Sequence, residues 1–117
     1  MKAYKIQVDP YEIIVSDNGK EETKNLCMKF ELPRILCNPN LGADDKGKAS
    51  KDFDLMEIGP IAQKIELCKD ILLTVSESEL KVLKKRVEVV SKYFGYSQYE
   101  MFRRINEAQP VEMVEGK

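Results

Sequence analysis

The sequence predicts one α+β domain, in which a small N-terminal antiparallel β-ribbon packs against about three helices in the C-terminal part. Two observations support this prediction. Alternating and β-branched residues precede position 20, and apolar residues repeat at steps of three and four after position 58. A length of 117 residues suits a single domain. We assign residues 1–108 to this domain and expect residues 109–117 to form a flexible or partner-bound tail.

The expected ribbon begins with residues 4–8, which alternate like a half-buried strand. It continues with residues 11–15, which are rich in β-branched side chains. Asn18 and Gly19 then predict a tight turn, because both residues tolerate a positive φ.

Residues 21–37 allow two interpretations. Leu26, Met28, Phe30 and Leu32 alternate like a strand, whereas the spacing of Leu26 and Phe30 also fits one face of a helix. Pro33 lacks a backbone donor and restricts the residue before it. We therefore expect either a third strand or a short helix that ends near Leu32.

Residues 38–50 are rich in turn-forming and charged residues, which predicts an exposed, mobile loop. Three helices are expected after it. Gly59 and Pro60 mark the start of the first, which we place at about residues 60–69.

The other two helices each follow an S-x-x-E motif, at residues 76–79 and 97–100. This motif predicts a capping box, in which the serine and glutamate side chains satisfy backbone donors. Gly95 is the expected C-cap between these helices. The predicted core consists of Ile6, Val8, Ile13, Val15, Ile61, Ile65, Leu80, Leu83, Val87, Val90, Phe94, Phe102 and Ile105.

The composition argues against most kinds of site chemistry. The chain has no histidine, which excludes imidazole acid–base catalysis and imidazole metal ligands. Cys27, Cys37 and Cys68 are scattered and flanked by apolar residues, so we expect buried, reduced thiols. No phosphate-binding glycine loop is present. We therefore expect no catalytic residues, no cofactor and no metal ion.

Charge and hydropathy indicate a cytoplasmic protein. Nineteen basic and twenty acidic residues give a net charge of −1, so no overall field attracts nucleic acid or an anionic membrane. No apolar run is long enough to span a bilayer, and the first residues lack the apolar core of a signal peptide.

Residues 90–105 resemble the helix-turn-helix of DNA-binding regulators. Ser91, Gly95 and Met101 stand where that family has a small residue, a turn glycine and a core residue, although Arg104 falls near an expected apolar position. The resemblance implies that Ser97, Gln98, Tyr99 and Arg103 would face the DNA groove, and that the phosphate contacts would come from Lys81, Lys84, Lys85, Arg86 and Lys92.

The alternative is a helical hairpin whose lysines form its solvated face. The balanced charge favours this hairpin, because DNA binding without a basic excess gains little from counterion release.

The whole layout is similar to that of short accessory proteins of tailed-phage and prophage genomes. The segments IAQKIE at residues 61–66 and LLTVSESELKVLK at residues 72–84, following a polar β-hairpin, carry this similarity over residues 1–108. It rests on pattern and length. It implies a virion or assembly component, a binder of a host factor, or a regulator, located in the host cytoplasm or the virion.

We expect a non-enzymatic protein-interaction module whose partner is another protein or a second copy of the chain. Five aromatic residues lie between positions 93 and 102, more than a short hairpin can bury. Aromatic side chains are good anchors in interfaces. The expected interface residues are Tyr93, Tyr96, Tyr99 and Phe102. The alternative function is DNA binding through Lys81, Lys85, Lys92, Gln98 and Arg103.

Overall fold

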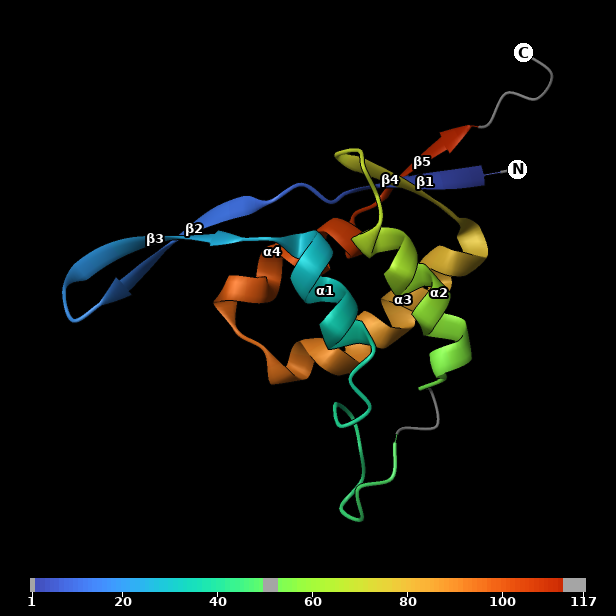
Figure 1. The fold of residues 1–117 in the computed structure, drawn as a ribbon, viewed down its shortest axis with the longest axis horizontal. Helices are drawn as coiled ribbons and strands as arrows, with labels where there is room; N and C mark the ends of the chain where they lie inside the picture. The colour runs from blue at the N-terminus through green and yellow to red at the C-terminus, as the bar shows by residue number, and fades with distance from the viewer. Residues whose placement is uncertain (1, 50–52, 113–117) are drawn as a thin grey trace.

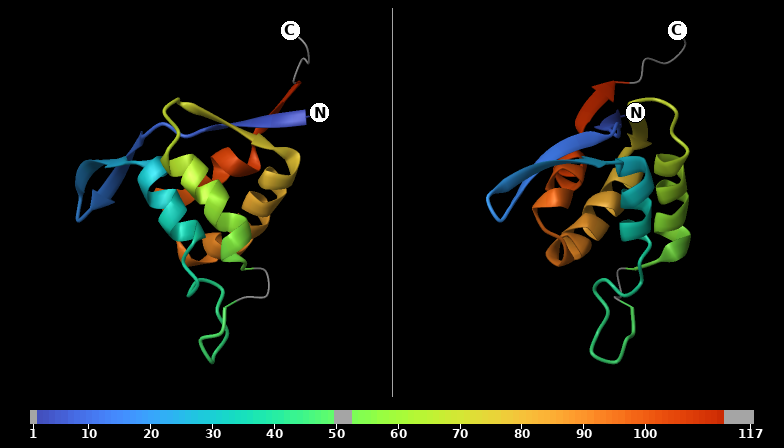
Figure 2. Two further views of the ribbon diagram at one scale, coloured as in Figure 1. Left: turned by 45° about the vertical axis from the view of Figure 1, so that its right-hand side comes forward. Right: turned by 60° about the vertical axis from the view of Figure 1, so that its left-hand side comes forward.

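A computed structural model describes residues 2–49 and 53–112. It contains a three-stranded antiparallel sheet, a separate two-stranded ribbon and four α-helices (Figure 1). The sheet lies along one side of the helices, and residues 38–49 project from the opposite side (Figure 2). The protein is therefore an α+β domain, as predicted.

The central strand of the sheet is β1 (Lys2–Gln7), with β4 (Leu72–Ser76) on one side and β5 (Gln109–Glu112) on the other. Ile6 pairs with Leu73, and both side chains are buried. The prediction that residues 4–8 pair with residues 11–15 is wrong. The β1–β4 pairing continues to Val8, whose N–H donates to the Ile71 carbonyl at 2.8 Å, and the chain then leaves the sheet.

Strand β5 occupies the first four residues of the segment for which a flexible or partner-bound tail was expected. Lys2 pairs with Glu112, and Lys5 pairs with Gln109. The two paired strands lie far apart in the sequence, so no short-range sequence pattern predicts that they pair. Residues 113–117 of the expected tail lie outside the described part of the chain.

Strands β2 (Tyr11–Asp17) and β3 (Lys20–Leu26) form the ribbon, joined by the predicted turn. Asn18 has φ 50° and Gly19 has φ 80°, as a type I′ hairpin turn requires. This ribbon, which we call the arm, extends away from the helices (Figure 1). Ile13 and Val15 are therefore only half-buried and do not belong to the core, contrary to the prediction.

Residues 21–37 contain both of the expected alternatives, one after the other. Strand β3 ends at Leu26, and helix α1 spans Met28–Leu36. Pro33 does not end this helix. Its missing donor removes one backbone hydrogen bond, but the helix buries Met28, Leu32, Ile35 and Leu36, which outweighs that loss.

Helix α2 spans Leu55–Glu66 and starts earlier than predicted, because the Asp54 side chain accepts a hydrogen bond from the Met56 N–H at 2.9 Å. Pro60 consequently lies inside the helix instead of in its first turn. Helix α3 (Glu77–Val90) begins at Ser76 with the predicted capping box.

A short 3₁₀ helix, η1 (Ser91–Tyr93), links α3 to α4 (Tyr96–Asn106). The second predicted capping box is absent, because α4 begins before Ser97 and Gly95 is its N-cap. Gly95 is therefore not the C-cap of α3, and its φ of −113° gives no reason for a glycine.

The core is formed mainly by the helices and the inner face of the three-stranded sheet. Phe94 was predicted in this core but is only half-buried at its edge. Among the fully buried side chains, those absent from the predicted core are Met28, Leu32, Leu36, Val75 and Met101, of which only Met101 was expected to be buried, through the helix-turn-helix resemblance. The prediction of buried thiols is wrong for Cys27, which is exposed, whereas Cys37 and Cys68 are half-buried; all three are free.

Arg86 was a predicted phosphate contact, but it is 4% exposed. Its guanidinium donates hydrogen bonds to the carbonyls of Leu36 (2.8 Å), Asn38 (2.6 Å) and Leu41 (3.1 Å). These carbonyls lie at the end of α1 and in the following loop, where a helix dipole is negative. Arg86 therefore fixes the start of the loop to α3 and cannot reach a DNA backbone without leaving the core.

Residues 38–49 form a loop without helix or strand, and Ser50 of the predicted loop lies outside the described residues. The Asp44 side chain accepts hydrogen bonds from the N–H groups of Lys46 (2.9 Å) and Lys48 (2.8 Å), which shapes a turn at the tip.

Candidate protein-binding groove

A groove of about 490 Å³ lies between η1, the connection that follows it and α4, and we call it the aromatic groove. The chain forms one side of the groove with η1 and the two residues that follow it, and the other side with α4. The lining residues are Ser91, Phe94, Gly95, Tyr96, Tyr99, Phe102, Arg103, Asn106 and Glu107.

Two phenylalanines form the floor of the aromatic groove. The Phe94 and Phe102 ring centroids are 6.2 Å apart with the ring planes tilted by 56°, a favourable arrangement for an aromatic pair. Phe102 is buried and Phe94 is half-buried. Both pack against the core, so the floor is fixed in position.

Two tyrosines stand at the rim of the groove. Tyr96 is 76% exposed and Tyr99 is 58% exposed, although both are large aromatic side chains. Tyr96, Tyr99 and Phe102 are spaced three residues apart, so they follow one face of α4. The rim and the floor together offer apolar surface and two hydroxyl groups to a ligand.

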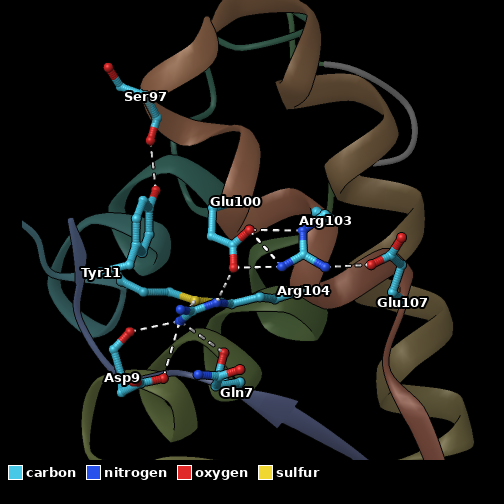
Figure 3. Close-up of polar contacts among 9 residues, drawn as sticks. Gln7, Asp9, Tyr11, Ser97, Glu100, Arg103, Arg104 and Glu107 are labelled. Carbon is cyan, nitrogen blue, oxygen red and sulfur yellow. Dashed lines mark hydrogen bonds and ion pairs between the residues drawn. The ribbon is translucent and has the colours of Figure 1, made fainter. Parts of the chain in front are cut away.

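Arg103 forms the polar wall of the groove and is held by two carboxylates (Figure 3). Its guanidinium donates to Glu100 at 2.8 and 2.7 Å, and to Glu107 at 2.6 Å. A DNA phosphate would therefore have to displace two carboxylates from Arg103.

Arg104 lies beneath this wall and is 8% exposed (Figure 3). Its guanidinium donates to Glu100 at 3.0 Å and to the Asp9 carbonyl at 2.7 Å, and it lies 5.1 Å from the centre of the Tyr11 ring. The Asp9 Oδ1 atom is buried without a hydrogen bond, but it lies 3.4 Å from Arg104 Nη1, which gives it a charged neighbour. Arg104 thus takes the place that the helix-turn-helix pattern gives to an apolar residue.

The network shifts the pKa values of two of its members. Burial acts to raise the pKa of Glu100, but hydrogen bonds from Arg103 and Arg104 outweigh burial and hold this pKa below its usual value. Burial and the charges of Glu31 and Glu100 raise the pKa of Tyr11 to about 12. Glu100 is therefore a carboxylate at neutral pH, and Tyr11 keeps the proton that it donates to the Ser97 carbonyl at 2.7 Å.

The structure gathers three of the four predicted interface residues, Tyr96, Tyr99 and Phe102, in the aromatic groove. Tyr93 is 53% exposed on η1 and is not among the lining residues. Phe94 and the Glu100–Arg104 network were missed as site residues. The spacing of Phe94 suggested a simple core position, and the side-chain contacts of Arg104 with Asp9 and Tyr11 connect distant parts of the sequence.

The residues predicted for DNA binding do not form one surface of free charges. Lys81, Lys85 and Lys92 are exposed on α3 and η1, and Gln98 is half-buried on α4. Arg103 is bound to carboxylates and Arg86 is buried. Helix α4 and the connection through η1 instead line the aromatic groove, to which no described residue of α3 contributes.

Within residues 2–49 and 53–112, no three cysteine or acidic side chains lie close enough together to hold a metal ion. The described helices are also too short or too polar to cross a lipid bilayer. In comparisons with known proteins, no family model, no curated protein and no solved structure matches this chain.

Proposed function

We propose that the protein is a non-enzymatic protein-interaction module that holds a segment of a partner protein in the aromatic groove. The exposure of Tyr96 and Tyr99 beside a fixed phenylalanine floor is the observation that supports this function. Leaving two large aromatic side chains in water gains nothing for folding, whereas their burial against a partner removes apolar surface from water.

The residues that line the groove predict which side chains a partner segment would place in it. The Phe94–Phe102 floor favours an apolar or aromatic side chain, and the tyrosine hydroxyls can bond to the partner's backbone. Glu107 also lines the groove, but its carboxylate is paired with Arg103 at 2.6 Å, so neither side chain offers an unpaired charge that selects for a charged partner residue. A role of this kind agrees with an assembly component or a host-factor binder, which the resemblance to phage accessory proteins implies.

DNA binding is the weaker alternative. The carboxylates of Glu100 and Glu107 neutralise Arg103, the cation that the helix-turn-helix resemblance places in the DNA groove. We therefore expect mixed-sequence duplex DNA to leave the elution and light scattering of the protein unchanged at low and at moderate salt. A salt-sensitive complex that weakens in Arg103→Ala would favour the regulator instead.

A selection from displayed random peptides tests the groove directly. We expect the protein to enrich peptides that contain an aromatic or large apolar residue, which would lie on the phenylalanine floor. Tyr99→Ala should weaken binding of the selected peptides about tenfold or more, because aromatic anchors dominate interface energy.

Tyr93→Ala is the matched control, since Tyr93 is similarly exposed but does not line the groove. Equal losses for Tyr93→Ala and Tyr99→Ala, or selected peptides that bind both variants as well as the wild type, would contradict the proposed function.

A further inference from the structure

The arm presents a strand edge that has no neighbour. Within the described residues, β3 is the only strand hydrogen-bonded to β2. The arm is anchored at its base, where Tyr11 and Leu26 pack against the core and Tyr11 bonds to Ser97. Beyond that base, two strands stand away from the helices (Figure 1). A two-stranded ribbon is only marginally stable in water without further strands or packing.

The two edges of the arm differ in chemistry. Strand β3 has the sequence KEETKNL and is exposed from Lys20 to Asn25, with charged residues of the kind that protect an edge. Strand β2 has the sequence YEIIVSD, with three consecutive β-branched apolar residues, and Ile14 is 63% exposed. Between Glu12 and Asp17, the central four residues of β2 therefore carry none of the charge that keeps an edge from pairing.

The hairpin register determines which backbone groups face outward on β2. Asp17 and Lys20 flank the two-residue turn, and a turn of this type joins such residues by a hydrogen bond. Hydrogen-bonded and non-hydrogen-bonded pairs alternate along an antiparallel pair. The backbone groups of Glu12, Ile14 and Ser16 therefore point away from β3, toward the open edge.

We infer that the β2 edge pairs antiparallel with β2 of a second copy of the chain, around a two-fold axis at Ile14. This register matches the outward groups of both copies, because Ile14 lies opposite Ile14 and Glu12 lies opposite Ser16. Three pairs of residues can then exchange hydrogen bonds, and the two arms form one four-stranded sheet.

The side chains are complementary in this register. Ile13 lies opposite Val15 of the second copy, so the apolar residues of both arms meet at the centre of one face. On the other face the two Ile14 side chains meet, and exposed Ile14 is covered. No like charges lie opposite each other, since Glu12 faces a serine.

The fold leaves room beside the base of β2. A hollow of about 320 Å³ lies between β2 and α4, lined by Tyr11, Glu12, Ile13, Tyr96, Tyr99 and Glu100. In the proposed register the turn of the second copy comes to lie near this hollow. No described residue of β2 lines the aromatic groove, although the hollow shares Tyr96 and Tyr99 of α4 with it.

Sedimentation equilibrium over a concentration series tests the inferred dimer. We expect the wild type to form a concentration-dependent dimer, and Ile14→Arg to weaken association about tenfold or more, because two arginines would meet at the axis. Ile14 is exposed, so this variant should fold. Thr23→Arg, which changes the outward edge of β3, is the control and should dimerise like the wild type.

Disulfide trapping identifies the register. In a Cys27→Ser background, Ile14→Cys should give a linked dimer on oxidation whose peptides join position 14 to position 14, whereas Thr23→Cys should not. A monomer at every concentration, a dimer unaffected by Ile14→Arg, or a link at position 23 would each overturn the inference. Since Ile14→Arg leaves the aromatic groove intact, its peptide binding reports on the proposed function independently.

Discussion

Arg103 and Arg104 are adjacent in sequence but lie in different environments. The Arg103 side chain is 39% exposed and pairs with carboxylates at the surface, whereas the Arg104 side chain is 6% exposed and connects α4 to the residues that follow β1. Surface pairs contribute little because water already solvates their charges. Removing one partner of a buried pair leaves the other charge uncompensated.

We expect Arg104→Ala to lower the free energy of unfolding by about 3 kcal/mol, because Glu100, Asp9 and the nearby carbonyls lose their buried cation. Arg103→Ala, the neighbouring control, should change it little. Urea denaturation of the two variants measures the difference, and equal losses would show that the buried network does not stabilise the fold.

The network also predicts that the free energy of unfolding decreases as the pH is lowered into the acid range. The pKa of Glu100 is lower in the folded state than its ordinary value of about 4.3. Its contribution to stability is therefore complete above that pH and is lost as the pH falls through the folded pKa.

Urea midpoints measured between neutral pH and acid should therefore fall in the wild type below about pH 4.3. They should fall less steeply in Glu100→Gln. The same slope in both proteins would mean that other carboxylates, such as Glu79 beside Lys64, cause the acid sensitivity.

At the scale of single elements, two identical motifs behave differently. Ser76 and Glu79 form a reciprocal capping box at the start of α3, with bonds of 3.1 and 2.9 Å. Ser97 and Glu100 have the same spacing, but α4 begins two residues earlier than a cap at Ser97 would place it, and Glu100 binds the two arginines instead. The motif alone does not determine where a helix begins when a stronger partner competes for the glutamate.

Ser76→Ala should lower the free energy of unfolding by about 1 kcal/mol, the usual effect of losing a serine cap. Ser97→Ala should cause no comparable loss, since Ser97 caps nothing and its carbonyl, not its side chain, binds Tyr11. Thermal unfolding followed by circular dichroism compares the two, and a larger effect at Ser97 would contradict the assignment of the caps.

The sequence predicted elements whose signals are local. Apolar spacing indicated the helices after position 58, and Asn18 and Gly19 indicated the hairpin turn. It could not predict which strands pair, because β1 finds both its partners more than 60 residues away. The arginine network was unpredictable for the same reason, since burial of Arg104 depends on Asp9 and Tyr11.

At the scale of the whole molecule, strand β5 connects the two ends of the described chain. We expect a chain that ends at residue 108 to be less stable than one that ends at residue 112 by about 1–2 kcal/mol, because β1 loses the backbone hydrogen bonds along one edge. Urea denaturation of the two chains measures this difference. Equal stability would mean that β5 contributes nothing to the folded domain.

Because β1 is the central strand of its sheet, both of its edges depend on strands that are synthesised later. A ribosome synthesises β1 before β4 and β5, the strands that cover its two edges, and more than 60 residues separate β1 from either strand. During translation both edges of β1 therefore stay unpaired until those strands are made, and the apolar side chains of Ile6 in β1 and of Val8 just after it stay unburied. The arm and α1 can form in the meantime, since their contacts are local. A chaperone that binds nascent chains would find a target in residues 2–8 until β4 and β5 have been made.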